Sequence, residues 1–65
     1  MKWEYMIINL QFAHASNNKI EQISNKHYNI TGTHHFMAEK LDGVGEFEWE
    51  VITEHERRLI LKRSK

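Results

Sequence analysis

Residues 41–63 constrain the fold more than any other part of the chain. Up to Val44 the apolar residues recur at helical spacing, whereas from Phe47 onward they alternate with charged residues, as in a strand with one buried face. The period changes at Gly43 and Gly45, which predicts a helix that ends there in a left-handed turn. A second alternating run, residues 59–63, then predicts a terminal β-hairpin.

The size of the chain limits how much of it can be buried. Its 65 residues form one domain, residues 1–65, and the lack of cysteine excludes disulfides and thiolate metal sites. Chains of about 60 residues bury only about 60% of their unfolded surface. We therefore expect a partner to complete the fold, either in a homodimer or in a complex with another protein.

The N-terminus and the hydropathy pattern predict a cytoplasmic protein. The chain opens with Met-Lys-Trp-Glu-Tyr, which lacks the basic and apolar segments of a secretory signal. The longest apolar run, residues 5–8, is far shorter than the roughly 20 residues that span a membrane. Nine acidic residues balance nine Lys and Arg residues, which counts against general nucleic-acid binding.

Residues 2–12 predict a strand with apolar side chains on both faces. One face carries Trp3, Tyr5 and Ile7, and the other carries Met6, Ile8, Leu10 and Phe12. A single helix covers only one face of so small a sheet. We expect the aromatic residues Trp3, Tyr5 and Trp49 to pack under the helix, and the face with Ile8, Leu10 and Phe12 to be free for association.

The middle of the chain gives weaker signals. Residues 13–30 predict a loop that leads into a strand ending near Ile30. Thr33 is a suitable N-cap, and Met37, Leu41 and Val44 form a helical stripe after it. The predicted fold is therefore α+β: a three- to four-stranded antiparallel sheet with one α-helix, residues 33–44, packed on one face.

The terminal hairpin can be placed in register from the sequence. An acidic block precedes the turn and a basic block follows it, so a three-residue loop, residues 55–57, matches acids with bases. The predicted pairs are Glu54–Arg58, Ile52–Ile60, Val51–Leu61 and Glu50–Lys62. This register leaves an apolar spot among charges, and the predicted partner-binding residues are Ile8, Leu10, Phe12, Ile52, Ile60, Glu50, Glu54 and Arg58.

Two stretches of the sequence resemble a small bacterial and phage family, the domain of unknown function 4177. The resemblance covers residues 2–10 and 41–63, and the matching positions are Tyr5, Leu41, Val44, Gly45, Trp49, Glu50, Val51, Ile52, Leu61, Lys62 and Arg63. The family usually has glycine directly before the tryptophan, where this chain has Glu48. The resemblance implies a small antiparallel sheet with one helix and implies no activity.

The histidines and carboxylates do not form a recognisable catalytic or metal motif. His35 and Glu39 lie one helical turn apart beside His34, and a metal site would need a further ligand from His14, His27 or His55, which the spacing does not specify. His55 between two glutamates lies at a predicted hairpin tip, which offers no dry pocket for a general base. We expect no enzyme activity, no cofactor and no metal.

Two functions remain after these exclusions. The first is a protein-interaction module that binds and blocks a partner, as phage- or mobile-element-encoded inhibitors of the anti-CRISPR type do. The second is a single-stranded nucleic-acid-binding protein that stacks bases on exposed aromatics. The residues for the second function are Trp3, Tyr5 and Trp49 with Lys2, Lys62 and Arg63.

Overall fold

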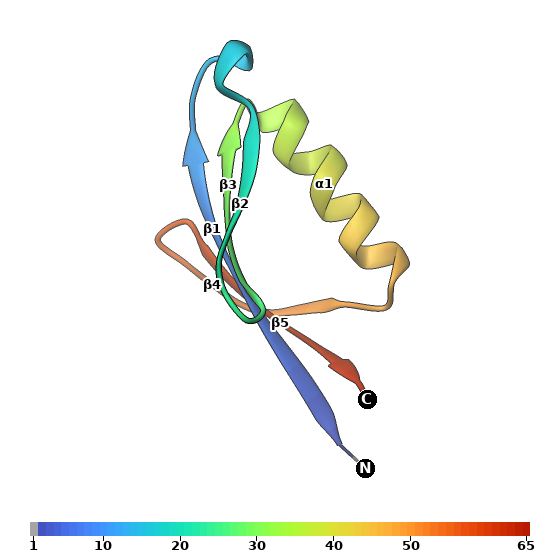
Figure 1. Cartoon of the computed structure of the whole chain (residues 1–65). Coiled ribbons are helices and arrows are strands. Elements are labelled where there is room, and N and C mark those ends of the chain that lie inside the picture. Colours follow the sequence, from blue (N-terminus) through green and yellow to red (C-terminus); the bar gives the residue numbers. More distant parts are fainter. Residues whose placement is uncertain (1) are drawn as a thin grey trace.

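The strand β1 (Trp3–Phe12) is the centre of the fold, and one hairpin pairs with each of its edges (Figure 1). The first hairpin consists of β2 (Lys19–Ser24) and β3 (His27–Gly32), and the second of β4 (Glu50–His55) and β5 (Arg58–Ser64). The sheet order is β2-β3-β1-β5-β4. The helix α1 (His34–Glu46) connects the two hairpins and lies on one face of the sheet. The computed structural model describes residues 2–65.

The α+β class is confirmed, but the sheet is larger than predicted and is not purely antiparallel. It has five strands, and β1 pairs in parallel with β3. The segment predicted as a loop forms the short 3-10 turn η1 (Ala15–Asn17) and then the β2–β3 hairpin. Lys26 takes a left-handed conformation in the hairpin turn, with φ 58°. Apolar and polar residues do not alternate regularly in this segment, because β2 is an edge strand whose residues are all exposed. The sequence pattern therefore did not indicate a strand.

The face of β1 that packs under the helix is the opposite of the predicted one. Ile8 is 2% exposed and forms the core with Met6, whereas Trp3 and Tyr5 are 43% and 53% exposed. The neighbouring strands decide this, because they place Leu61 opposite Met6 and both Leu59 and Tyr28 opposite Ile8, whereas Lys62 lies opposite Tyr5. The core residues are Met6, Ile8, Ile30, Met37, Leu59 and Leu61.

The helix starts where the sequence predicts and ends later. Thr33 caps its N-terminus, because its Oγ1 accepts a hydrogen bond of 3.1 Å from the Phe36 amide. The prediction that Gly43 and Gly45 end the helix is wrong, since α1 continues to Glu46. The left-handed turn falls instead at Glu48, with φ 70°.

The terminal hairpin reaches its register by a different route from the predicted one. Its turn has two residues, Glu56 and Arg57, both with positive φ. A bulge between Val51 and Thr53 then shifts the register by one residue. The predicted pairs Val51–Leu61 and Glu50–Lys62 are therefore confirmed, whereas Glu54–Arg58 and Ile52–Ile60 are wrong, because the structure pairs Glu54 with Leu59 and Thr53 with Ile60.

Replacing Glu48 with glycine is expected to stabilise the fold by about 1 kcal/mol, because a left-handed conformation is strained for a residue with a Cβ atom. Urea unfolding followed by circular dichroism measures the change. Glu39→Gly, at an exposed position in the middle of α1, serves as the control and is expected to destabilise by roughly 0.5–1 kcal/mol. Equal effects of the two substitutions would contradict the assigned turn.

Candidate functional site

The sheet face that points away from α1 is the candidate site, and we call it the open face. The register of β1 with its two neighbours places their side chains on this face together. The helix lies on the other side of the sheet (Figure 1). The residues of the open face include Trp3, Tyr5, Ile7, Asn9, His27, Asn29, Glu50, Arg58, Ile60 and Lys62.

One end of the open face is aromatic. Trp3 and Tyr5 leave about half of their surface exposed, in the part of β1 that pairs with β5 and not with β3. Lys62 lies directly opposite Tyr5, and its Nζ is 4.5 Å from the centroid of the Trp3 ring. Further along, Ile7 lies opposite Ile60, and both are half-buried. This end therefore presents two rigid aromatic side chains, one cation and an aliphatic pair.

The other end of the open face is a hydrogen-bonded polar cluster around Asn9. The Asn9 Nδ2 amide donates to Asn29 Oδ1 at 3.1 Å and lies 2.9 Å from His27 Nε2. The Arg58 Nε donates to Asn9 Oδ1 at 3.3 Å. Because Asn9 is held on both sides, Arg58 is oriented while most of its donors stay free for a ligand. Beside the cluster lies a hollow of about 530 Å³, lined by residues that include Thr53, His55 and Ile60.

The basic side chains of the molecule divide into neutralised and unneutralised groups. On the helix side of the sheet, Glu4 Oε1 accepts from Lys26 Nζ at 2.6 Å and Glu4 Oε2 accepts from Arg63 Nε at 3.1 Å. These bonds, the one from Lys26 first, hold the pKa of the Glu4 carboxyl below its ordinary value. On the open face, Arg58 and Lys62 have no carboxylate oxygen within 4.0 Å among residues 2–65. The open face thus carries two cations that are available to a partner.

The structure separates the residues predicted to bind a partner. Arg58, Ile60 and Glu50 belong to the open side of the sheet, since they pair with Asn9, Ile7 and Lys62. Ile52 is exposed at the bulge of the edge strand. The remaining four lie elsewhere and do not form the predicted surface: Ile8 is core, Leu10 packs against the core, Phe12 stacks on His34 at 4.1 Å, and Glu54 pairs with the buried Leu59.

Sequence reasoning predicted Arg58 of the polar cluster but missed Asn9, His27 and Asn29. Asn9 follows Tyr5 and Ile7 at every second position of β1, so the period of two in a strand places all three side chains on one face. His27 and Asn29 had no comparable signal, because the parallel pairing of β3 with β1 joins segments without a direct turn between them. Trp49, predicted as a stacking residue, lies on the helix side, where Arg63 covers its ring at 4.5 Å.

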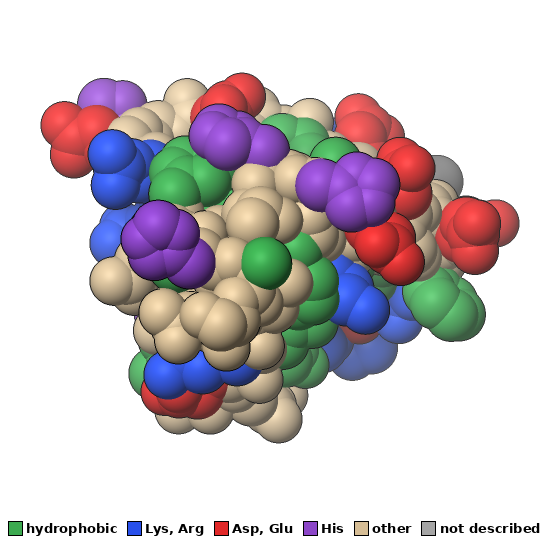
Figure 2. All heavy atoms as spheres, turned by 90° about the horizontal axis from the view of Figure 1, so that it is seen from above, with side chains coloured by type: hydrophobic (Ala, Val, Ile, Leu, Met, Phe, Trp, Pro, Cys, Tyr) green, Lys and Arg blue, Asp and Glu red, His purple; other side chains and the backbone are tan. Residues whose placement is uncertain are grey.

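The histidines do not gather into a metal centre. Figure 2 shows histidine side chains spread over the end of the molecule where β1 ends and α1 begins. His35 and Glu39 do meet, with Nε2 and Oε2 at 3.9 Å, and both are exposed. Within residues 2–65, no group of three or more His, Cys, Asp or Glu side chains has an arrangement that could hold a metal ion.

Comparisons with protein-family models, curated proteins and solved structures gave no match, so the functional proposal depends on the residues of the site themselves. Within the part of the chain that the structure describes, the one helix is too short and too polar to cross a membrane.

The Glu4 network predicts a pH dependence of stability. A carboxyl whose pKa is lowered by folding stabilises the fold above its unfolded pKa, and this stabilisation is lost as the pH falls through the folded pKa. Glu4→Gln is therefore expected to lower the melting temperature near neutral pH, and the difference from wild type should vanish below about pH 3. Thermal melts across this range measure it. Glu39→Gln, on the exposed surface of α1, is the control and should change little at any pH.

Proposed function

We propose that this protein is a non-enzymatic protein-interaction module that binds a partner with its open face. The observation that carries the proposal is the joint exposure of Trp3 and Tyr5 on the open face, in the part of β1 that pairs with β5. Large apolar side chains that stay exposed together mark interaction surfaces. Tryptophan, tyrosine and arginine are also the residues that most often supply the binding energy of protein interfaces.

The two ends of the open face define the chemistry of the partner. Trp3 and Asn9 are six residues apart on one strand, which corresponds to about 20 Å. A partner that spans this length would bury an apolar group against Trp3 and Tyr5 and place an acidic group against Arg58. Because the cations Arg58 and Lys62 are not neutralised within the chain, an acidic partner surface complements them.

We place this binding in the class of inhibitors that phages and mobile elements encode, including anti-CRISPR-type proteins. Such proteins act by occupying a surface of a larger partner. A chain of 65 residues with one aromatic and basic face has the size and the surface for that role. A second copy of the chain is another protein that the open face can bind, which would give a homodimer.

Single-stranded nucleic-acid binding is the second candidate, and one observation favours it. Exposed aromatics, two free cations and an amide and imidazole cluster occur on the same sheet face. Bases stack on such aromatics, phosphates contact the cations, and amides hydrogen-bond base edges. The zero formal charge of the chain is less favourable, because phosphate binding depends on uncompensated basic residues.

The proposed function predicts that the double substitution Trp3→Ala and Tyr5→Ala removes partner binding while the fold is kept. Each hot-spot side chain contributes about 2 kcal/mol or more, which is about 30-fold in affinity, so the loss of both should exceed the loss of one. Host-lysate capture with mass spectrometry measures it, using wild type and variant as baits. Phe47→Ala is the matched control, because Phe47 is 68% exposed on the helix side. A partner captured equally by all three baits would contradict binding through the open face.

Two further measurements separate the candidates. Sedimentation at increasing protein concentration detects a homodimer, which the double substitution at Trp3 and Tyr5 should dissociate. Filter binding of single-stranded oligonucleotides across salt concentrations tests the second candidate. A steep salt slope that Arg58→Gln and Lys62→Gln reduce would support nucleic-acid binding, and no binding at low salt would remove it.

A further inference from the structure

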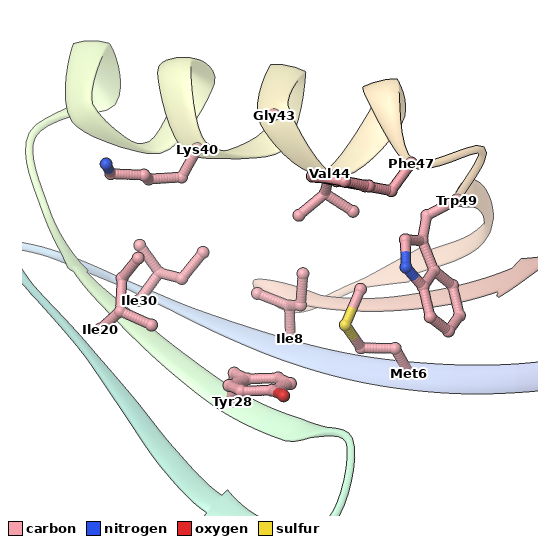
Figure 3. Close-up of a pocket in the computed structure, with 10 residues that line it drawn as sticks. All are labelled: Met6, Ile8, Ile20, Tyr28, Ile30, Lys40, Gly43, Val44, Phe47 and Trp49. Carbon is pink, nitrogen blue, oxygen red and sulfur yellow. The ribbon is translucent and has the colours of Figure 1, made fainter.

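A groove lies between α1 and the sheet, on the side opposite to the open face. It has a volume of about 320 Å³, within the range of small-molecule sites. Its floor is formed by side chains of the sheet, including Met6, Ile8 and Ile30, and Trp49 stands at one end (Figure 3). The walls are almost entirely apolar. The groove is therefore a continuation of the hydrophobic core, in which helix side chains do not fill the space above the sheet.

The groove is open because the helix has a glycine above it. Gly43 lines the groove from α1, and a Cβ atom at this position would meet no atom within 4 Å. Glycine inside a helix lowers stability by about 1 kcal/mol relative to alanine. No close approach of neighbouring atoms requires glycine here, and its local effect is to leave space between helix and sheet.

Lys40 is the charged residue of the groove wall. Its side chain extends along the groove at the end away from Trp49 (Figure 3). The Lys40 Nζ is 5.4 Å from the centroid of the Phe36 ring, and among residues 2–65 it has no carboxylate oxygen within 4.0 Å. An apolar groove with one unneutralised cation at its end complements a ligand with an apolar body and one anionic head.

We propose that this groove binds a medium-chain carboxylate. The apolar chain lies on Met6, Ile8 and Ile30, and the carboxylate pairs with the Lys40 ammonium. From residue 40 to residue 47 the helix rises about 10 Å, which sets a chain of about eight carbons. Polar metabolites and nucleotides do not fit, because the walls between Lys40 and Trp49 offer them few hydrogen-bond partners. The site is separate from the open face and does not depend on the function proposed for it.

The fluorescence of Trp49 provides the test, in a Trp3→Phe background that leaves Trp49 as the one tryptophan. Octanoate should change this fluorescence with saturation. Lys40→Met keeps the apolar stem and removes the charge, so it should weaken octanoate at least tenfold and leave 1-octanol within about twofold. Lys62→Met, on the open face, is the matched control and should bind octanoate as the background does.

Filling the groove is the second arm of the test. Gly43→Leu places a side chain in the open space and favours the helix, so it should remove the binding of both octanoate and octanol. Circular dichroism shows whether the Gly43→Leu variant folds. If this variant does not fold, the comparison of Lys40→Met with Lys62→Met tests the proposal by itself. Three results would overturn the proposal: no response of Trp49 to millimolar octanoate, equal weakening by Lys40→Met and Lys62→Met, or a dimer that buries the groove.

Loss of partner binding and loss of carboxylate binding are distinguishable. The double substitution Trp3→Ala and Tyr5→Ala should remove the first, whereas Lys40→Met should weaken only the second. In the variant with Trp3→Ala and Tyr5→Ala, Trp49 is again the one tryptophan, so its fluorescence reports octanoate binding there as well. If both variants lose both activities, neither site is assigned correctly.

Discussion

The alternation of side chains along β1 is the constraint on which the rest of the structure depends. This strand pairs in parallel with β3 on one edge and antiparallel with β5 on the other. Once Met6 and Ile8 point to the helix, Tyr5 and Asn9 must point away from it. A slip of one residue would exchange the two sets and bury the Asn9 cluster under α1. The unfavourable burial of those polar groups, together with the loss of the aliphatic core, fixes the register of the whole sheet.

The open face and the groove are therefore two sides of the same strand. Ile8 forms part of the groove floor, and Ile7, its neighbour in sequence, lies on the open face. The Glu4 network holds the ends of this arrangement together, since it joins the β2–β3 turn to β5 through Lys26 and Arg63. Arg63 also donates to the Phe47 carbonyl, in the connection between α1 and β4, at 3.1 Å. Arg63 thus links the C-terminal end of α1 to Glu4, which lies between Trp3 and Tyr5 in β1.

Features that depend on neighbouring residues in the sequence were mostly predicted correctly. Features that depend on which strands pair were predicted poorly. The Thr33 cap, the helical stripe and two hairpin pairs are local patterns and were confirmed. The core face of β1 was assigned wrongly, because both faces carry apolar residues and only the strands beside it decide between them. The helix end was misplaced because the chain puts Glu48 where glycine is favoured and puts glycines inside the helix. For the candidate site, β1 predicted an apolar face, while the polar cluster depended on the parallel pairing of β3, which no pattern in the sequence indicated.

Because the core is small, binding at the open face or in the groove would change the stability of the fold. Among residues 2–65, six hydrophobic side chains are buried, whereas Trp3, Tyr5, Ile20 and Phe47 are among the large apolar residues left exposed. A chain of this size has a small free energy of unfolding. Any molecule that binds only the folded state therefore increases this free energy by a large fraction. At a ligand concentration of about 100 times Kd the gain is about 2.7 kcal/mol, a large share of the stability of a small domain. Occupation of either surface would therefore complete the fold as well as serve a function, and the two effects would be measured together in the melting temperature.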